Sequence, residues 1–400
     1  MAKIEYNPDA CIACNTCVAQ CPVAAVNPDF PGPRITGPAS QRFRIMGNID
    51  EETLHFCANC KNCDISCPHN VPISAFNMIA RAAVTKQSPF SLRDWMLSHG
   101  ALLGRKLALI PAALRNVGML NPLTRRLLDM LGIAAAAPLP KFAAQTFKQR
   151  MRTYPQPPSQ RQVVLFPGCY IDLYDPQTGL DLVWLLNKAG YEVLVPNDFD
   201  CCGLPMIANG FMEDARANAR TNWAEVSAWC AKGIPVLTAC PSCNLMFNRD
   251  LGEYFPEIAT GTAALRDAQE FVLECVERGE LALPAPDPQA QAMLYHAPCH
   301  LRAQGLGLPG LRLLQAVYGN AVSNADAGCC GISGSYGFKK ENYAIAQAIG
   351  TPLFETITKS GVALTTSECG TCRVQIKHGT GKPCLHPLTL VRRRLERTQA

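Results

Sequence analysis

Short apolar runs alternate with longer helical patterns over the C-terminal part of the chain. The apolar runs predict strands, and the segments between them repeat their apolar positions with a helical period. Strands are predicted at 163–166, 193–195, 236–238, 293–295, 321–323 and 362–365, and helices at 180–188, 213–231, 311–318 and 341–359. This alternation predicts an α/β fold with mostly parallel sheets covered by helices.

The same landmarks occur twice in this region. "VVLFPGC" at 163–169 matches "MLYHAPC" at 293–299, "CCGLP" at 201–205 matches "CCGIS" at 329–333, and "LTACPSC" at 237–243 matches "TTSECGTC" at 365–372. The matching cysteines are separated by 128 to 130 residues. A nearly constant offset predicts an internal duplication. The cysteines mostly follow predicted strands, where open α/β sheets place their ligands.

Two Pro-rich stretches, "YPQPPSQ" at 154–160 and "ELALPAPDPQAQA" at 280–292, predict linkers. Together with a basic segment that begins at residue 96, they divide the chain into four predicted parts. These are an α-helical module at 1–95, a basic amphipathic helical segment at 96–153, and two tandem α/β cysteine-rich domains at 161–279 and 292–400.

The positive charge of the chain is unevenly distributed and concentrated in the basic segment, although the net charge of the whole chain is only +5. Between residues 96 and 150, eight Lys and Arg residues accompany one acidic residue, Asp129. Two apolar helical faces are predicted, one from Leu103, Leu107, Ile110 and Leu114 and one from Leu123, Leu127, Met130 and Leu131, with Arg125, Arg126 and Asp129 opposite the second. These faces fit an anionic lipid surface or packing against the protein, and the sequence leaves both open.

The chain has 21 cysteines, and from its sequence we expect neither a secretory leader nor an apolar stretch long enough to span a membrane. In a reducing compartment, spaced cysteines predict metal ligands or redox thiols. "CIACNTCVAQCP" and "CANCKNCDISCP" both have the C-x2-C-x2-C-x3-C-P spacing of bacterial two-cluster ferredoxins, in which the fourth cysteine ligates the other cluster. We therefore predict one 4Fe-4S cluster on Cys11, Cys14, Cys17 and Cys67, and a second on Cys57, Cys60, Cys63 and Cys21, with each fourth cysteine starting a helix. Zinc or plain buried thiols are the alternatives.

Each half of the duplication contributes five further cysteines. The first set is Cys169, Cys201, Cys202, Cys240 and Cys243, and the second is Cys299, Cys329, Cys330, Cys369 and Cys372. Neighbouring side chains of an extended chain point to opposite sides, so an adjacent pair suits a larger or open cluster better than one small ion. Gly203 and Gly331 allow a turn with positive φ beside that cluster. The remaining cysteines, Cys230, Cys275 and Cys384, are predicted to be structural, the first two as buried thiols in helices.

These motifs, with the stretches "NPDFPGPRITGP" at 27–38, "CCGLPMIANGF" at 201–211 and "CCGISGSYGFKKENYAIAQAIGTPLF" at 329–354, resemble the CCG cysteine-rich domain family. That family includes heterodisulfide reductase catalytic subunits and glycolate oxidase iron–sulfur subunits. Within this family the chain resembles the branch of anaerobic glycerol-3-phosphate dehydrogenase C subunits. The resemblance implies non-cubane 4Fe-4S clusters, or zinc, in the two five-cysteine sites.

The resemblance also implies an electron-transfer subunit without catalytic side chains of its own. Its partners would be two flavin-containing dehydrogenase subunits of the A and B type, which oxidise sn-glycerol 3-phosphate. Its acceptor would be the menaquinone or quinone pool, reached from a peripheral position on the cytoplasmic face of the bacterial inner membrane. No nucleic-acid partner is expected.

Three alternatives remain open: a heterodisulfide reductase-like catalytic subunit, a component of a glycolate- or lactate-oxidising complex, and a structural zinc protein. His296 and His300 flank Cys299 and are predicted to donate hydrogen bonds near that site, with ligation as the alternative.

Overall fold

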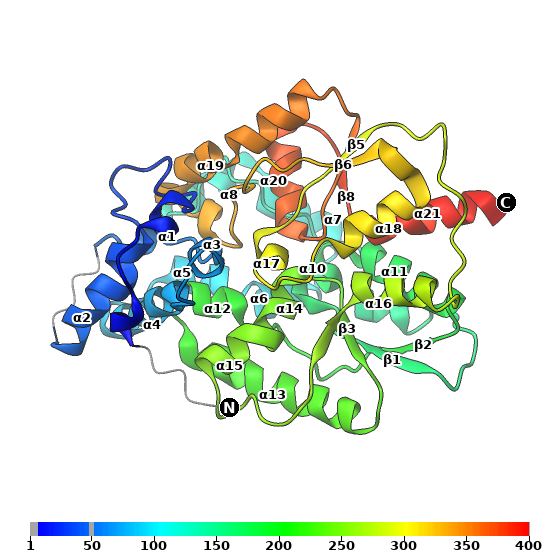
Figure 1. Cartoon of the computed structure of the whole chain (residues 1–400), viewed down its shortest axis with the longest axis horizontal. Helices are drawn as coiled ribbons and strands as arrows, with labels where there is room; N and C mark the ends of the chain where they lie inside the picture. Colours follow the sequence, from blue (N-terminus) through cyan, green and yellow to red (C-terminus); the bar gives the residue numbers. More distant parts are fainter. Residues whose placement is uncertain (1–6, 48–51, 400) are drawn as a thin grey trace.

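The computed structural model describes residues 7–47 and 52–399 of the chain. The N-terminal module lies at one end, in blue, and the two halves of the duplication fill the rest (Figure 1). The helices before the first sheet are α1 (Thr16–Ala19), α2 (Ser40–Ile45), α3 (Asn62–Ile65), α4 (Ile73–Gln87), α5 (Leu92–Ser98), α6 (Gly100–Leu107), α7 (Ala112–Leu120), α8 (Pro122–Met130) and α9 (Phe147–Met151). In the described ranges we find no helix with the length and apolar character needed to cross a bilayer.

The first half is a four-stranded parallel sheet with the order β2-β1-β3-β4. Its strands are β1 (Gln162–Leu165), β2 (Glu192–Leu194), β3 (Val236–Thr238) and β4 (Leu265–Asp267). Its helices are α10 (Gly168–Leu173), α11 (Pro176–Lys188), α12 (Leu204–Ala208), α13 (Met212–Ala231), α14 (Pro241–Leu245), α15 (Leu251–Tyr254) and α16 (Ala268–Glu277).

The second half repeats this topology, with four parallel strands in the order β6-β5-β7-β8. Its strands are β5 (Met293–Tyr295), β6 (Val322–Asn324), β7 (Leu364–Thr366) and β8 (Cys384–Leu385). Its helices are α17 (Cys299–Arg302), α18 (Pro309–Tyr318), α19 (Lys340–Lys359), α20 (Gly370–Thr380) and α21 (Pro387–Gln399). The predicted α/β class with parallel, helix-covered sheets is confirmed.

The hydrophobic pattern did not reveal the fourth strand of either sheet, β4 or β8. Both lie at a sheet edge; β4 has one apolar residue among three and β8 has only two residues, so neither forms an apolar run. Their pairing with β3 and β7 comes from tertiary contacts. Cys384 lies in β8, which gives this leftover cysteine a place in the sheet.

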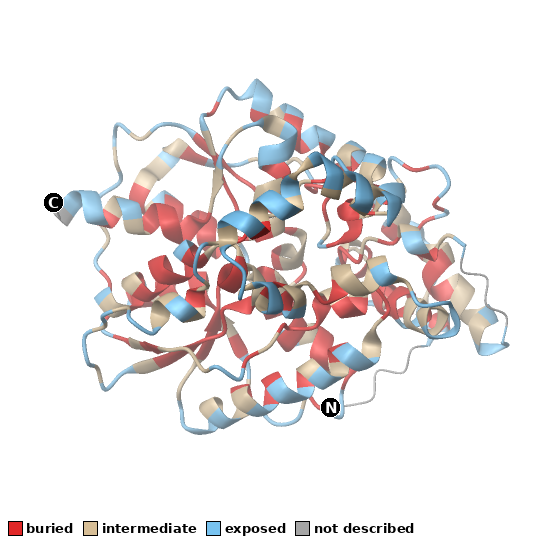
Figure 2. Cartoon of the chain, turned by 180° about the vertical axis from the view of Figure 1, so that it is seen from behind, coloured by how far each residue is buried: buried red, intermediate tan, exposed pale blue. Residues whose placement is uncertain are grey.

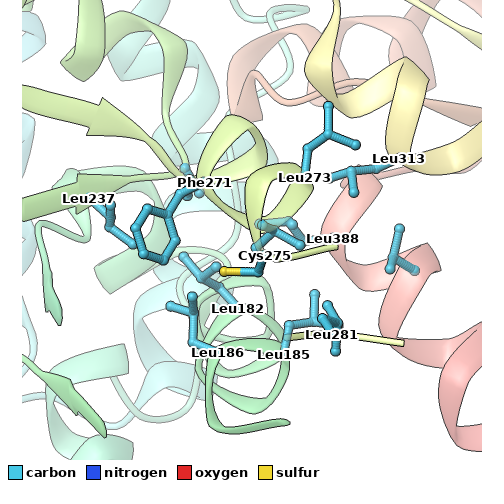
Figure 3. Packing of buried hydrophobic residues seen from close by; sticks show 14 of the residues in the cluster. Leu182, Leu185, Leu186, Leu237, Phe271, Leu273, Cys275, Leu281, Leu313 and Leu388 are labelled. Atoms are coloured by element: carbon cyan, nitrogen blue, oxygen red, sulfur yellow. The ribbon is translucent and has the colours of Figure 1, made fainter. Parts of the chain in front are cut away.

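The largest apolar core joins the two halves. Figure 3 shows Leu182 and Leu186 of α11 and Phe271 of α16 packed near Leu313 of α18 and Leu388 of α21. Figure 2 shows the same region as a buried centre under a largely exposed surface. Cys275 is fully buried here, as predicted, whereas Cys230 is only partly buried because it lies toward the end of α13.

The segment between residues 96 and 153 is more broken than the sequence predicts. α6 ends at Leu107 and α7 begins at Ala112, after Pro111, so the first predicted apolar face does not lie on one continuous helix. Proline lacks the amide that would continue α6. α8 starts after Asn121, whose side chain accepts a hydrogen bond from the Thr124 amide at 2.9 Å. Because this segment packs against both halves, the four domain boundaries stay predictions.

Neither fourth cysteine of the N-terminal motifs begins a helix, contrary to expectation. Cys21 and Cys67 instead follow the short helices α1 and α3. Cys67 is separated from α4 by Pro68 and Pro72, and the next helix begins only at Ile73. Each proline disfavours helical geometry at the residue before it, so the chain stays extended there.

Gly331 gives a test of how closely the second cysteine pair packs. Its φ is +86°, and a Cβ atom there would lie 1.9 Å from the Ala346 carbonyl oxygen of α19. Gly328 has a similar φ of +84° but open space around it. We expect Gly331→Ala to cost about 2–5 kcal/mol of stability and Gly328→Ala about 1–2 kcal/mol. Thermal unfolding followed by circular dichroism measures both, and equal midpoints would contradict this close approach.

Candidate functional site

The N-terminal cysteines surround two hollows, and each hollow takes its fourth cysteine from the other motif. Cys11, Cys14, Cys17 and Cys67 line a hollow of about 300 Å³. Cys21, Cys57, Cys60 and Cys63 line a second hollow of about 340 Å³. These groups match the two sets that the spacing predicts, while iron ligation by each individual residue stays a prediction.

Both cysteine loops curl by the same alternation of backbone conformation. Ala13 and Asn15 have φ values of +61° and +63°, and Asn59 and Lys61, at matching places in the second motif, have +50° and +66°. Successive right- and left-handed residues aim their amides into a common concavity that suits an anion. A thiolate-bound iron–sulfur cluster is such an anion, so the backbone fits this group as well as the cysteines do.

The electrostatics of the thiols also fit a bound metal centre. Burial raises the pKa of Cys21 to about 11, and the charges of Cys57 and Cys17 add to the increase. Burial likewise raises the pKa of Cys60 and Cys63 well above the ordinary value. Thiols in this state do not ionise unaided near neutral pH, and a metal supplies the positive charge that holds them as thiolates.

Amide groups donate hydrogen bonds to cysteine sulfur around these sites, and such bonds help to set reduction potentials. The Val71 amide donates to Cys67 at 3.4 Å, Asn77 Nδ2 donates to Cys57 at 3.5 Å, and the Gly331 amide donates to Cys329 at 3.3 Å.

A fully buried lysine fixes the second N-terminal loop to the first half. Lys61 Nζ lies 2.9 Å from Asp250 Oδ1 and 3.1 Å from Glu253 Oε2, and donates to the Tyr254 hydroxyl at 3.3 Å. Asp64 completes the group at 4.0 Å. Because an unpaired buried charge is strongly destabilising, this cluster holds the loop in one position. No local pattern indicates this cluster, since the partners of Lys61 in the first half are almost 200 residues away.

The five-cysteine sets lie at the carboxyl ends of the strands, where parallel sheets place ligands. In the first half, Cys169 lies in α10 after β1, Cys201 and Cys202 follow β2, and Cys240 and Cys243 begin α14 after β3. In the second half, Cys299 lies in α17 after β5, Cys329 and Cys330 follow β6, and Cys369 and Cys372 begin α20 after β7.

Within each set the thiols form a chain of neighbours. The Cys201 sulfur is hydrogen-bonded to the Cys169 and Cys202 thiols, and these hydrogen bonds lower the pKa of Cys201 well below the ordinary value. The Cys299 and Cys330 thiols lower the pKa of Cys329 in the same way.

The remaining thiols of the second five-cysteine set are also close neighbours. Cys330 Sγ lies 3.1 Å from Cys372 Sγ, and the Cys372 thiol lowers the pKa of Cys369 to about 5. The adjacent cysteines of each set are therefore close neighbours at one site. They lie in a loop rather than a strand, and the following glycines, Gly203 and Gly331, turn with the predicted positive φ.

The two histidines near Cys299 have different surroundings. His300 accepts a hydrogen bond at Nδ1 from the Ser242 hydroxyl, 2.8 Å away, and donates from Nε2 to the Asn59 carbonyl oxygen, 3.1 Å away. It thereby links both halves and the N-terminal module. His296 is buried, and burial lowers its pKa to about 4, so the ring is neutral.

A cavity of about 750 Å³ lies between the two halves. Its cysteines come from both sets, Cys169, Cys202, Cys240 and Cys243 from the first and Cys369 from the second. Tyr170, Leu204 and Asn59 also line it. The sequence did not predict this cavity, because its wall is assembled from three separate parts of the chain.

The four cysteine sites follow one another through the molecule. The charge of Cys17 raises the pKa of Cys21, so the first N-terminal site is a neighbour of the second. After burial, Cys329 is the largest cause of the raised pKa of Cys60, which joins the second N-terminal site to the second five-cysteine site. The charge of Cys369 raises the pKa of Cys240 and so opposes the hydrogen bond from Cys243, which lowers it. The first five-cysteine site is therefore a neighbour of the second.

Comparison with known proteins agrees with this arrangement. A family described as a 4Fe-4S dicluster domain matches residues 7–71, and a family described as a cysteine-rich domain matches residues 163–248 and 293–377. The fold and these matches define an iron–sulfur electron-transfer protein with one dicluster module and two cysteine-rich domains.

The relatives narrow this class. The C subunit of the anaerobic glycerol-3-phosphate dehydrogenase of Escherichia coli (strain K12) is 38% identical over 95% of this chain and 97% of its own length. The B subunit of the fumarate reductase (CoM/CoB) of Methanothermobacter marburgensis is 26% identical over 93% of this chain and 68% of its own length. The glycolate oxidase iron–sulfur subunit of Escherichia coli (strain K12) is 24% identical over 92% and 91%. The chain belongs to the family of anaerobic glycerol-3-phosphate dehydrogenase C subunits.

Removing one cysteine of the second N-terminal hollow tests its metal. We expect Cys63→Ala to lose between one and four irons per chain, because one iron of a cubane cluster loses its thiolate ligand. Cys275→Ala is the control, since Cys275 is equally buried but lies outside every site. Iron and acid-labile sulfide analysis of the purified protein measures the loss. Full iron in the Cys63 variant would contradict the assignment.

Proposed function

We propose that this chain conducts electrons from a flavin-containing sn-glycerol 3-phosphate dehydrogenase pair to the quinone pool. The row of four neighbouring cysteine sites is the observation that carries the proposal, because it forms a continuous route across the protein. Cubane 4Fe-4S clusters would occupy the two N-terminal hollows, and iron–sulfur clusters or zinc the five-cysteine sites. When bound, the clusters accept and release electrons, while the chain's own residues hold them and exclude water.

Electrons would be received at the first N-terminal site. Cys14 is exposed there, and the neighbouring Ile12 is 59% exposed, so a partner can approach this hollow closely. By contrast, Cys17, Cys60 and Cys63 are buried behind it. An exposed cysteine beside an exposed apolar side chain suits the docking of the flavin subunits at this end.

Electrons would leave from the first five-cysteine site and the cavity between the halves. The apolar wall of that cavity, with Tyr170 and Leu204, suits the ring of a quinone. The site also lies beside α6, because Arg105 lies 3.0 Å from Asp200 and its charge helps to lower the pKa of Cys201. Gly104 of the same helix packs against Leu173 of α10.

α6 to α8 would attach the protein to the cytoplasmic face of the inner membrane. Most of the large exposed apolar side chains in the described residues lie between Phe90 and Leu131, and the others lie before residue 80. Leu109, Val117 and Met130 are 91%, 67% and 83% exposed. Figure 2 views the chain from the side on which these helices lie.

The basic residues of this segment are only partly available to lipid. Arg105 pairs with Asp200, Arg115 lies over the Phe142 ring, and Arg125 donates to the carbonyl oxygens of residues 134, 135 and 137. Lys106, Arg126 and Lys141 remain exposed at the surface. Apolar insertion would therefore contribute more to attachment than charge does.

Membrane attachment is tested by placing charges on this face. We expect the combined Leu109→Glu, Val117→Glu and Met130→Glu variant to bind vesicles of phosphatidylethanolamine and phosphatidylglycerol at least tenfold more weakly. Burial of each apolar side chain in the lipid would stabilise binding by about 1.5–3 kcal/mol, and a charged side chain loses this contribution. The control is Ile45→Glu with Met46→Glu, which changes two exposed apolar residues at the end of α2. Co-sedimentation measures binding, and equal binding of both variants would contradict the proposal.

The oxidised substrate is tested with the assembled complex. When the chain is co-purified with its flavin subunits, we expect sn-glycerol 3-phosphate to bleach the iron–sulfur absorbance and glycolate or lactate to leave it unchanged. The flavin subunits without this chain provide the control for flavin bleaching. Bleaching by glycolate or lactate alone would assign the chain to a different oxidising complex.

The cavity between the halves favours a second candidate, a catalytic subunit that reduces a disulfide. Cysteines of both five-cysteine sets line this cavity, and a disulfide placed there would face two metal centres. In that case a mixed disulfide of two small thiols would reoxidise the reduced complex, whereas a water-soluble quinone would not.

A further inference from the structure

The duplication places different side chains at one equivalent position of the two five-cysteine sites. Phe166 comes three residues before Cys169, and His296 comes three residues before Cys299. The backbones correspond, because the Phe166 amide donates to the Leu237 carbonyl oxygen and the His296 amide donates to that of Thr366, both at 2.8 Å. The two sites therefore differ in side chain and not in chain path.

In the first half this position belongs to the apolar core. The Phe166 ring is fully buried and packs edge-on against Phe199 at 5.0 Å and Phe247 at 5.1 Å between ring centroids. It has no polar atom to offer to the neighbouring thiols, so this position supplies no ligand atom to the first site.

In the second half the same position carries a buried imidazole. His296 is 4% exposed, and its Nε2 atom has no hydrogen-bond partner among residues 7–47 and 52–399. One nitrogen of the ring and the sulfurs of Cys330 and Cys372 all lie within 4.8 Å of one another. A neutral imidazole buried beside thiols without a partner is costly, and a metal centre held by those thiols would remove the cost.

A nearby cation points to the same anionic centre. The charge of Arg302 in α17 helps to lower the pKa of His296, so the two side chains are neighbours. The buried Nε and Nη2 atoms of Arg302 also lack a hydrogen-bond partner in the described part of the chain. A thiolate-bound metal centre provides acceptors for these groups.

We propose that His296 is a nitrogen ligand of the second five-cysteine site, which makes it a mixed nitrogen–thiolate centre beside an all-thiolate first site. The proposal rests on the metal occupancy proposed above. A neutral imidazole adds less negative charge than a thiolate, and histidine ligands raise the reduction potentials of iron–sulfur centres. The second centre would therefore be reduced more readily than the first, so the duplication would have produced two centres with different potentials along one route.

The test follows the ligand atom directly. The complex is prepared with 15N-histidine, its metals are assayed, and the reduced iron centres are studied by pulsed electron paramagnetic resonance, or zinc by X-ray absorption at the zinc edge. We expect one strongly coupled nitrogen, or one nitrogen in the zinc shell, in the unmodified chain. His296→Phe, which copies the first half, should abolish it. His378→Phe, a second-half histidine outside the sites, should retain it.

A second variant places a different ligand at position 296, so that the proposal can still be tested if His296→Phe does not fold. His296→Cys should retain the metal, lose the nitrogen coupling and lower the midpoint potential of one centre in a redox titration. The proposal is overturned if the unmodified chain shows weak nitrogen coupling or none, or if the coupling persists in His296→Cys. A complex without metal in either five-cysteine site would instead overturn the proposed function.

Discussion

The structure depends on one electrostatic constraint, the crowding of buried thiols. In each five-cysteine set the thiols lie in hydrogen-bonding chains, and the pKa of one member falls well below normal while that of its neighbour rises well above it. Such a group cannot carry several negative charges in a dry interior unless cations are bound. Parallel strands, loop glycines and helix starts together bring these thiols to one point, where a metal centre compensates their charge.

The same constraint explains why the N-terminal module and the two halves form one body. Electron transfer between buried centres requires that they stay close, and the contacts that link the parts surround the cysteine loops. Lys61 pairs with Asp250 and Glu253 of the first half, Arg81 of α4 donates to the carbonyl oxygens of Cys57 and Ala208, and His300 joins both halves to Asn59. These long-range polar contacts fix the order of the four sites.

Local chemistry made much of this protein predictable. The cysteine spacing grouped the ligand sets, the landmark offsets revealed the duplication, and apolar runs placed most strands and long helices within a few residues. Prediction failed where local pattern was too short or misleading. The edge strands β4 and β8 lack a pattern, and Pro111 divides the predicted amphipathic helix.

The sequence by itself determined the four groups of cysteines and the class of fold, because ligand type, ligand spacing and hydrophobic period are local properties. Only the tertiary structure decided which centres are neighbours, since the pairs Cys60 with Cys329 and Cys240 with Cys369 join residues far apart in the chain. It also decided the surroundings of position 296. A histidine near a cysteine is common in a sequence, and only burial beside Cys330 and Cys372 gives this one a place at the site.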